Sequence, residues 1–189
     1  MGTDIALKEW AVHIKALAIG AQTVILRKGG IHEETKHFKV QSKQFLLFPT
    51  YEHQKKSLIA ESYHQMLDES LQEWRIDPQT IIMQYAAEVV AERLVFDEQQ
   101  LEQVASYHIG TPLFALERLH WKKLQPLHVL LLRVYKRSEP IKVTLKAEHA
   151  GCKSWLPVDE TPFDSVVWSP VVDDESFHDI FLQFTKQEG

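Results

Sequence analysis

The chain has little that would support a disulfide framework, a membrane span or a secretory signal. It has 189 residues and one cysteine, Cys152, which excludes an internal disulfide and fits a reducing compartment. Its longest apolar runs, such as residues 127–134, are interrupted by polar side chains and are too short to span a bilayer. Asp4, Lys8 and Glu9 interrupt what would have to be an apolar signal core. We therefore expect a cytoplasmic protein with no membrane segment.

Sequence patterns that mark common catalytic sites are also missing. The ten histidines form no H-E-x-x-H pattern and the single cysteine forms no C-x-x-C pair, so we predict neither a metal site nor a cofactor. There is no Walker phosphate loop and no G-x-S-x-G nucleophile elbow. The motifs alone do not identify a reaction.

The composition is that of an ordinary globular domain, with 44% hydrophobic and 25% charged residues. Helical and strand-like segments follow one another without regular strand–helix–strand alternation, which favours the α+β class. We predict one domain over residues 1–189, a small mixed or antiparallel β-barrel with peripheral helices. Helices are expected over 4–19, 52–74, 97–107, 113–119 and 176–184, and strands over 22–28, 38–40, 44–48, 80–96, 129–135, 140–145, 166–168 and 171–172.

Positive charge is concentrated in two segments of an otherwise acidic chain. The net charge is −5, yet residues 22–56 hold seven cations against three acids, and residues 117–153 hold nine against three. If the two segments meet in space, they form the footprint of a polyanion site. The alternative is that strands and loops use lysine on their surfaces while helices use glutamate.

The first basic segment contains the leading candidates for ligand binding. Arg27 and Lys28 precede the glycine pair Gly29–Gly30, where bare backbone N–H groups beside a guanidinium suit a phosphate. An ordinary tight turn with solvated cations explains the same residues.

A polar loop after the predicted strand at 44–48 supplies three further candidates. Tyr51 can stack on a base, Gln54 can read its edge and His53 can transfer a proton. The alternative is local, with Thr50 capping the following helix and Tyr51 packing beside it.

A secondary basic patch is predicted at Trp121, Lys122, Lys123 and Arg133. There the indole would stack on a base beside phosphate-binding lysines, although the sequence favours a core position for Trp121.

The run KEWAVHIKALAIGAQTVILRKGGIHEE, followed by FLLFPTYEHQ, resembles the opening of an uncharacterised bacterial family known only as a domain of unknown function. That resemblance implies no activity.

A more distant resemblance is to the ASCH branch of the PUA-like superfamily, whose signature is G-x-K-x-x-E-x-R. Gly20 and Arg27 match the signature, whereas Gln22 replaces its lysine and Ile25 its glutamate. This resemblance implies a PUA-like barrel and the recognition of RNA or modified bases.

Two other functions remain open from the sequence. A metal-dependent nuclease or phosphodiesterase needs paired carboxylates and a lysine, and the candidates for these are Glu88, Glu92, Lys142, Lys146 and Glu148. A protein-interaction module would use the acidic segment 159–179. The favoured function is the binding of RNA or another polyanion.

Overall fold

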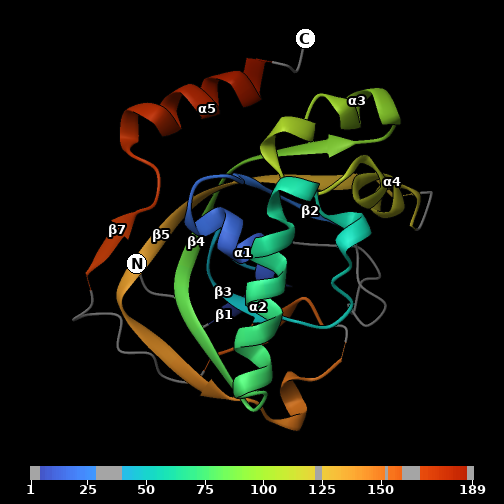
Figure 1. Ribbon diagram of the computed structural model, residues 1–189. Helices are drawn as coiled ribbons and strands as arrows, with labels where there is room; N and C mark the ends of the chain where they lie inside the picture. The colour runs from blue at the N-terminus through green and yellow to red at the C-terminus, as the bar shows by residue number, and fades with distance from the viewer. Residues whose placement is uncertain (1–4, 29–39, 122–124, 152, 159–166, 187–189) are drawn as a thin grey trace.

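The computed structural model describes residues 5–28, 40–121, 125–151, 153–158 and 167–186. Within them lies one mixed sheet of seven strands in the order β2-β5-β4-β3-β1-β6, with β7 paired to β5, and it curls into a half-barrel flanked by helices (Figure 1). The predicted α+β class and mixed sheet are thus confirmed. The strands are β1 (Ile5–Trp10), β2 (Val24–Arg27), β3 (Gln44–Thr50), β4 (Thr80–Val95), β5 (Leu127–Thr144), β6 (Trp155–Pro157) and β7 (Trp168–Pro170).

The five α-helices of the described chain are α1 (Ala11–Ala18), α2 (His64–Ile76), α3 (Glu98–Glu102), α4 (Pro112–His120) and α5 (Asp174–Lys186). Short 3-10 helices cover Lys56–Leu58, Glu61–Tyr63, Ala105–Tyr107 and Ala147–His149. Side-chain caps begin two helices in regions predicted to be helical: Asp97 accepts from the Gln100 N–H, and Thr111 accepts from the Phe114 N–H.

The first predicted helix is correct only in its second half. Residues 5–10 form β1, which lies between β3 and β6 in the sheet, and the helix begins at Ala11. Gly20 ends this region in the left-handed conformation that favours glycine, with φ of 73°. The β1–β3 pair is the one parallel pair among the described strands, so both strands end at the same edge of the sheet.

Strands β4 and β5 form the long antiparallel ladder at the centre of the sheet. The strand predicted over residues 80–96 is confirmed as one bent strand, with register shifts between Met83 and Tyr85 and between Val89 and Ala91. The separate strands predicted at 129–135 and 140–145 are one strand, β5. The strand predicted at 38–40 lies mostly outside the described residues.

Helices α1 and α2 lie side by side over the β1–β3 part of the sheet, and α5 lies near β5 at the far end (Figure 1). Two arginines hold α5 in place. Arg93 donates to the Phe184 carbonyl, and Arg133 pairs with Asp174 while its guanidinium lies 4.4 Å from the centre of the Phe177 ring. None of the described helices is both long enough and apolar enough to cross a membrane.

Candidate functional site

A pocket of about 500 Å³ opens at the edge where β1 and β3 end together. Trp10 lies opposite Thr50 in the parallel register, and the chain after each strand turns away from the sheet there. The pocket is lined by residues from β1, β2, β3, α2, β4, α4 and the segment after β5: Lys8, Glu9, Trp10, Arg27, Phe48, Pro49, Thr50, Tyr51, Glu52, His53, Trp74, Ile81, Arg118, Leu145, Lys146, His149, Ala150, Gly151, Lys153 and Ser154.

A buried carboxylate, Glu9, forms part of the pocket wall. Its Oε1 accepts the Trp10 N–H at 2.8 Å, and its Oε2 lies 3.4 Å from Arg27 Nη1. Burial opposes ionisation, but the nearby charges of Arg27 and Arg118 and the Trp10 hydrogen bond together lower the pKa of Glu9. The pocket therefore contains an anionic carboxylate at neutral pH.

Arg118 reaches the same pocket from α4. Its guanidinium lies 4.3 Å from the centre of the Phe114 ring and 5.6 Å from that of Trp10. Burial lowers the pKa of Arg118, while the charge of Glu9 raises it. No hydrogen bond or ion pair joins this guanidinium to any described residue, and its Nε is buried without a partner. Its Nε–H is thus a buried donor without a partner in the pocket wall.

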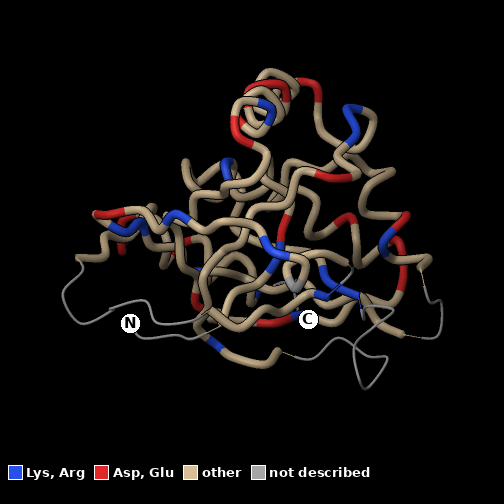
Figure 2. The backbone as a smooth tube through the Cα atoms, turned by 90° about the horizontal axis from the view of Figure 1, so that it is seen from below, with Lys and Arg blue, Asp and Glu red and all other residues tan. Residues whose placement is uncertain are grey.

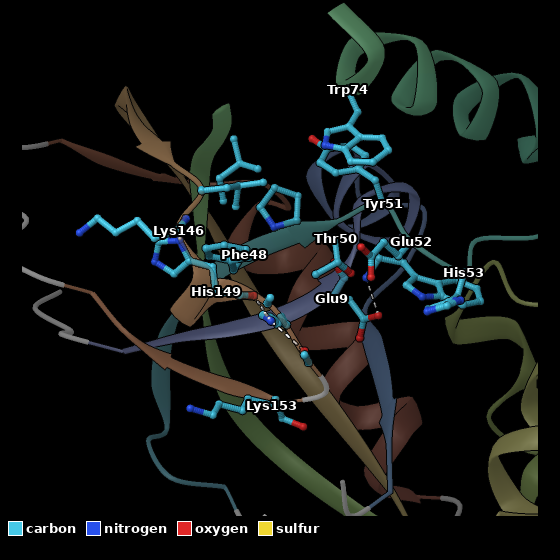
Figure 3. A pocket seen from close by; sticks show the side chains of 18 of the residues that line it. Glu9, Phe48, Thr50, Tyr51, Glu52, His53, Trp74, Lys146, His149 and Lys153 are labelled. Atoms are coloured by element: carbon cyan, nitrogen blue, oxygen red, sulfur yellow. Dashed lines mark hydrogen bonds between the residues drawn. The ribbon is translucent and has the colours of Figure 1, made fainter. Parts of the chain in front are cut away.

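An aromatic pair forms another wall of the pocket (Figure 3). The rings of Tyr51 and Trp74 are stacked, with centroids 5.5 Å apart and planes 7° apart. Burial raises the pKa of Tyr51, so the phenol stays protonated at neutral pH. The stack joins the loop after β3 to the last turn of α2.

The rim of the pocket is basic. Lys8 donates to the carbonyls of His149 and Gly151 and so fixes the turn after β5, while Lys146 and Lys153 are exposed (Figure 3). The lining has five cations, Lys8, Arg27, Arg118, Lys146 and Lys153, against two acids, Glu9 and Glu52. A net lining charge of +3 thus occurs in a chain whose net charge is −5.

His53 lines the pocket in an unusual backbone conformation, with φ of 64°, and its side chain is exposed. Non-glycine residues adopt positive φ rarely, although histidine does so more readily than most. Beside it, the Thr50 hydroxyl donates to the Glu9 carbonyl at 3.1 Å and ties the two strand ends together.

The sequence profile of a family described as a domain of unknown function, DUF1802, matches residues 6–183. The chain belongs to the DUF1802 family. This confirms the resemblance noted in the opening residues. Comparison with curated proteins gives no significant match.

Among solved structures, the DUF1802 chain is similar to a mutant form of the ZmASCH protein from Zymomonas mobilis, with 11% identity and a TM-score of 0.44. The match covers 94% of this chain and 95% of the other.

Three of the predicted ligand-binding residues, Arg27, Tyr51 and His53, line the pocket of this DUF1802 domain. Lys28, next along the chain from Arg27, is buried and donates to the Leu119 carbonyl, and burial lowers its pKa. Gln54 accepts from the Val12 N–H and so supports α1. Neither residue lines the pocket, and both side chains make hydrogen bonds to the backbone of neighbouring elements. Gly29 and Gly30 lie outside the described residues.

The predicted secondary patch does not form part of the pocket. Arg133 is buried beneath α5, and Trp121, which is 42% exposed, is not among the lining residues. Lys122 and Lys123 lie outside the described residues. Lysines and arginines are interspersed with acids along the backbone in Figure 2. Among the described residues of the two basic segments, Arg27, Arg118, Lys146 and Lys153 line the same pocket.

Sequence reasoning missed Glu9, Arg118, Trp74 and Lys153 as site residues. Trp74 fits the apolar stripe of the helix expected over 52–74 and so indicated a core position, and the other three were counted only as charges. Arg118 follows Phe114 at the i+4 spacing of a helix, a local signal that the two side chains would meet.

Beside the pocket lies a buried polar group built on Gln22, the residue that replaces the ASCH signature lysine. Its Nε2 donates to the Val24 carbonyl at 2.8 Å, and its Oε1 accepts from the Ile109 N–H at 3.3 Å and lies 2.8 Å from His13 Nδ1. His13 Nδ1 therefore carries the hydrogen. Burial lowers the pKa of His13, so its imidazole is neutral at neutral pH.

Among the residues that the structure describes, no three His, Cys, Asp or Glu side chains gather as metal ligands would. Of the nuclease candidates, Glu92 is hydrogen-bonded to His128 and Glu88 lies opposite Arg133 across the β4–β5 ladder. Lys146 lines the pocket. These positions favour no divalent-metal mechanism.

Proposed function

We propose that the protein binds single-stranded RNA or a nucleotide in the pocket at the ends of β1 and β3. The observation that carries the proposal is the composition of the pocket lining. The lining has a net charge of +3 in a chain whose net charge is −5, and it includes the stacked rings of Tyr51 and Trp74. Proteins that bind single strands combine these two features, since cations follow the phosphates and aromatic rings stack on the bases.

The exposed lysines of the rim are suited to phosphates. Lys146 and Lys153 lie on the segment after β5, and Lys8 holds the intervening turn through two backbone carbonyls. A fixed turn presents its lysines at a lower entropic cost than a free loop would. The phosphate backbone would therefore follow the rim, with a base directed inward.

The test is a salt titration of binding to a labelled single-stranded oligonucleotide, followed by fluorescence anisotropy. Replacing Lys146 and Lys153 together by alanine should weaken binding and reduce the magnitude of the salt slope by about 1.4, the value for two lost phosphate contacts on a single strand. The matched control replaces Lys136 and Lys186, two exposed lysines outside the pocket.

Equal losses in the two double variants would mean that binding reflects net charge alone. No binding by the wild-type protein at low ionic strength would overturn the proposal. Cleavage of the labelled strand, detected on a gel with and without Mg²⁺ or Mn²⁺, would indicate an enzyme in place of a binding domain.

A further inference from the structure

The Glu9 carboxylate retains unused acceptor capacity in the pocket wall. Oε1 accepts one hydrogen bond from the Trp10 N–H, and Oε2 accepts one, at 3.4 Å, from Arg27. A carboxylate offers about four acceptor sites, two on each oxygen, so each oxygen can accept one more. Glu9 and the stacked rings of Tyr51 and Trp74 border the same pocket (Figure 3).

Arg118 supplies the complementary group. Its guanidinium is near enough to Glu9 for the two charges to interact, and it lines the same pocket. The Phe114 ring at 4.3 Å and the Trp10 ring at 5.6 Å hold the guanidinium without using its N–H donors. A planar fork of donors held in this way is preorganised for an acceptor on a ligand.

A ligand that satisfies both groups has two neighbouring N–H donors with an acceptor beside them, all on one edge of a flat ring. Guanine has this order, because O6, N1–H and N2–H lie in sequence on its Watson–Crick edge. Adenine places the N1 lone pair where the second donor is needed, and cytosine places N3 and O2 there. Uracil has a single donor between two acceptors. Only guanine among the four common bases pairs fully with a carboxylate beside an arginine.

We propose that the pocket selects guanine. In this arrangement Glu9 accepts from N1–H and N2–H, Arg118 donates to O6, and the base lies against the Tyr51–Trp74 wall. Arg27 acts as a positioning residue, since its ion pair orients the carboxylate. The inference rests on the proposed function and adds base selectivity to it.

The competing explanation is that Glu9 serves only as a counter-ion for Arg27 and Arg118. Both explanations predict that removing the carboxylate disturbs the site, so the decisive test varies the ligand and leaves the protein intact. Wild-type protein is titrated calorimetrically with the monophosphates of guanosine, 1-methylguanosine, inosine and adenosine.

The guanosine nucleotide should bind about tenfold or more tightly than the adenosine nucleotide, the usual discrimination of a bidentate base contact. Methylation of N1 removes one donor and blocks the carboxylate, so it should abolish the preference. Inosine lacks the N2 amino group and should lie between the two. Equal affinity for the four nucleotides would overturn the guanine assignment.

The variant test is Glu9→Gln, which keeps the side-chain shape but offers one acceptor and one donor. It should remove the tenfold preference for the guanosine nucleotide over the adenosine nucleotide. Thermal unfolding of the variant establishes that it is folded, and if it is not, the ligand series still decides. If RNA binds but the bases are not distinguished, the proposed function stands and the guanine assignment falls. If neither RNA nor any nucleotide binds, both fall.

Discussion

The phenol ring of Tyr51 lies parallel to the indole of Trp74, with 5.5 Å between ring centroids and 7° between ring planes. This contact joins two segments that the sequence separates, the loop after β3 and the end of α2. It brings two half-buried aromatic side chains together beside the basic rim.

Replacing Trp74 by leucine should therefore reduce affinity for single-stranded RNA about tenfold, within the range measured for loss of a base-stacking aromatic. Trp121→Leu is the matched control, because Trp121 is also partly exposed but does not line the pocket. Anisotropy with one labelled oligonucleotide measures both variants. A larger loss in Trp121→Leu would move the stacking surface to the secondary patch predicted from the sequence.

Gln22 should be one of the most sensitive polar positions in the chain. Gln22→Leu leaves the His13 ring N–H, the Ile109 N–H and the Val24 carbonyl without their partner. The expected loss in the free energy of unfolding is about 3 kcal/mol, measured by urea denaturation. Gln65→Leu on the exposed face of α2 should change it by less than about 0.5 kcal/mol. Equal effects would argue against the buried network.

The free energy of unfolding should fall as the pH is lowered through the range in which His108 is protonated in the unfolded state but neutral in the folded state. Burial, together with the charges of His13 and Arg118, lowers the pKa of His108 from 6.5 to about 4. Between these two pH values His108 binds a proton in the unfolded chain but not in the folded protein. The free energy of unfolding therefore falls by up to about 3 kcal/mol as the pH falls from about 6.5 to 4.

The variant that tests this is His108→Asn, whose side-chain oxygen can replace Nδ1 as the acceptor of the Gly110 N–H. Its unfolding free energy, measured by denaturant at pH 7 and pH 5, should depend less on pH than that of the wild type. His13 shifts in the same direction, so some dependence remains. An unchanged slope would contradict the assignment.

Arg133 should matter for stability and not for RNA binding. Its side chain is 8% exposed, whereas that of its partner Asp174 is 97% exposed, so the ion pair itself contributes little. The contact with the Phe177 ring and the hydrogen bond to the Asp173 carbonyl remain. Arg133→Ala should cost about 2 kcal/mol of unfolding free energy.

The same variant should bind single-stranded RNA as the wild type does, because Arg133 lies outside the pocket. Arg133→Lys serves as the control for charge, since it keeps the cation and loses the planar contact with Phe177. A loss of RNA affinity in Arg133→Ala, with α5 still folded by circular dichroism, would place a second basic surface beneath that helix.

Local signals in the sequence were enough for the fold class and for most of the later elements. Gly20, Asp97 and Thr111 mark chain reversals and helix starts through their own conformational preferences, which do not depend on distant residues. Strand β1 was missed because the spacing of Leu7, Trp10, Ile14 and Leu17 fits a helix throughout. Residues 5–10 form a strand because they pair with β3 and β6, and the sequence of residues 5–10 alone does not indicate this pairing.

The site was found in part for the same reason. Arg27, Tyr51 and His53 sit in short polar stretches next to strands, where loop residues are presented by a rigid scaffold. Arg118, Trp74 and Lys153 come from three separate elements, and each has an ordinary helical or surface setting in the sequence. Only the closing of the sheet brings them together.

The position of β1 also determines when the pocket can exist during synthesis. This N-terminal strand becomes an interior strand only when Ile5 pairs with Pro157, and Lys8 reaches the carbonyls of His149 and Gly151 only at the same stage. Contacts so distant in sequence form late and slow the folding of a domain. A nascent chain that ends before residue 157 carries the Glu9 wall and the Tyr51 stack without β6 to complete the sheet beside them, so binding activity should appear only after β6 has been synthesised.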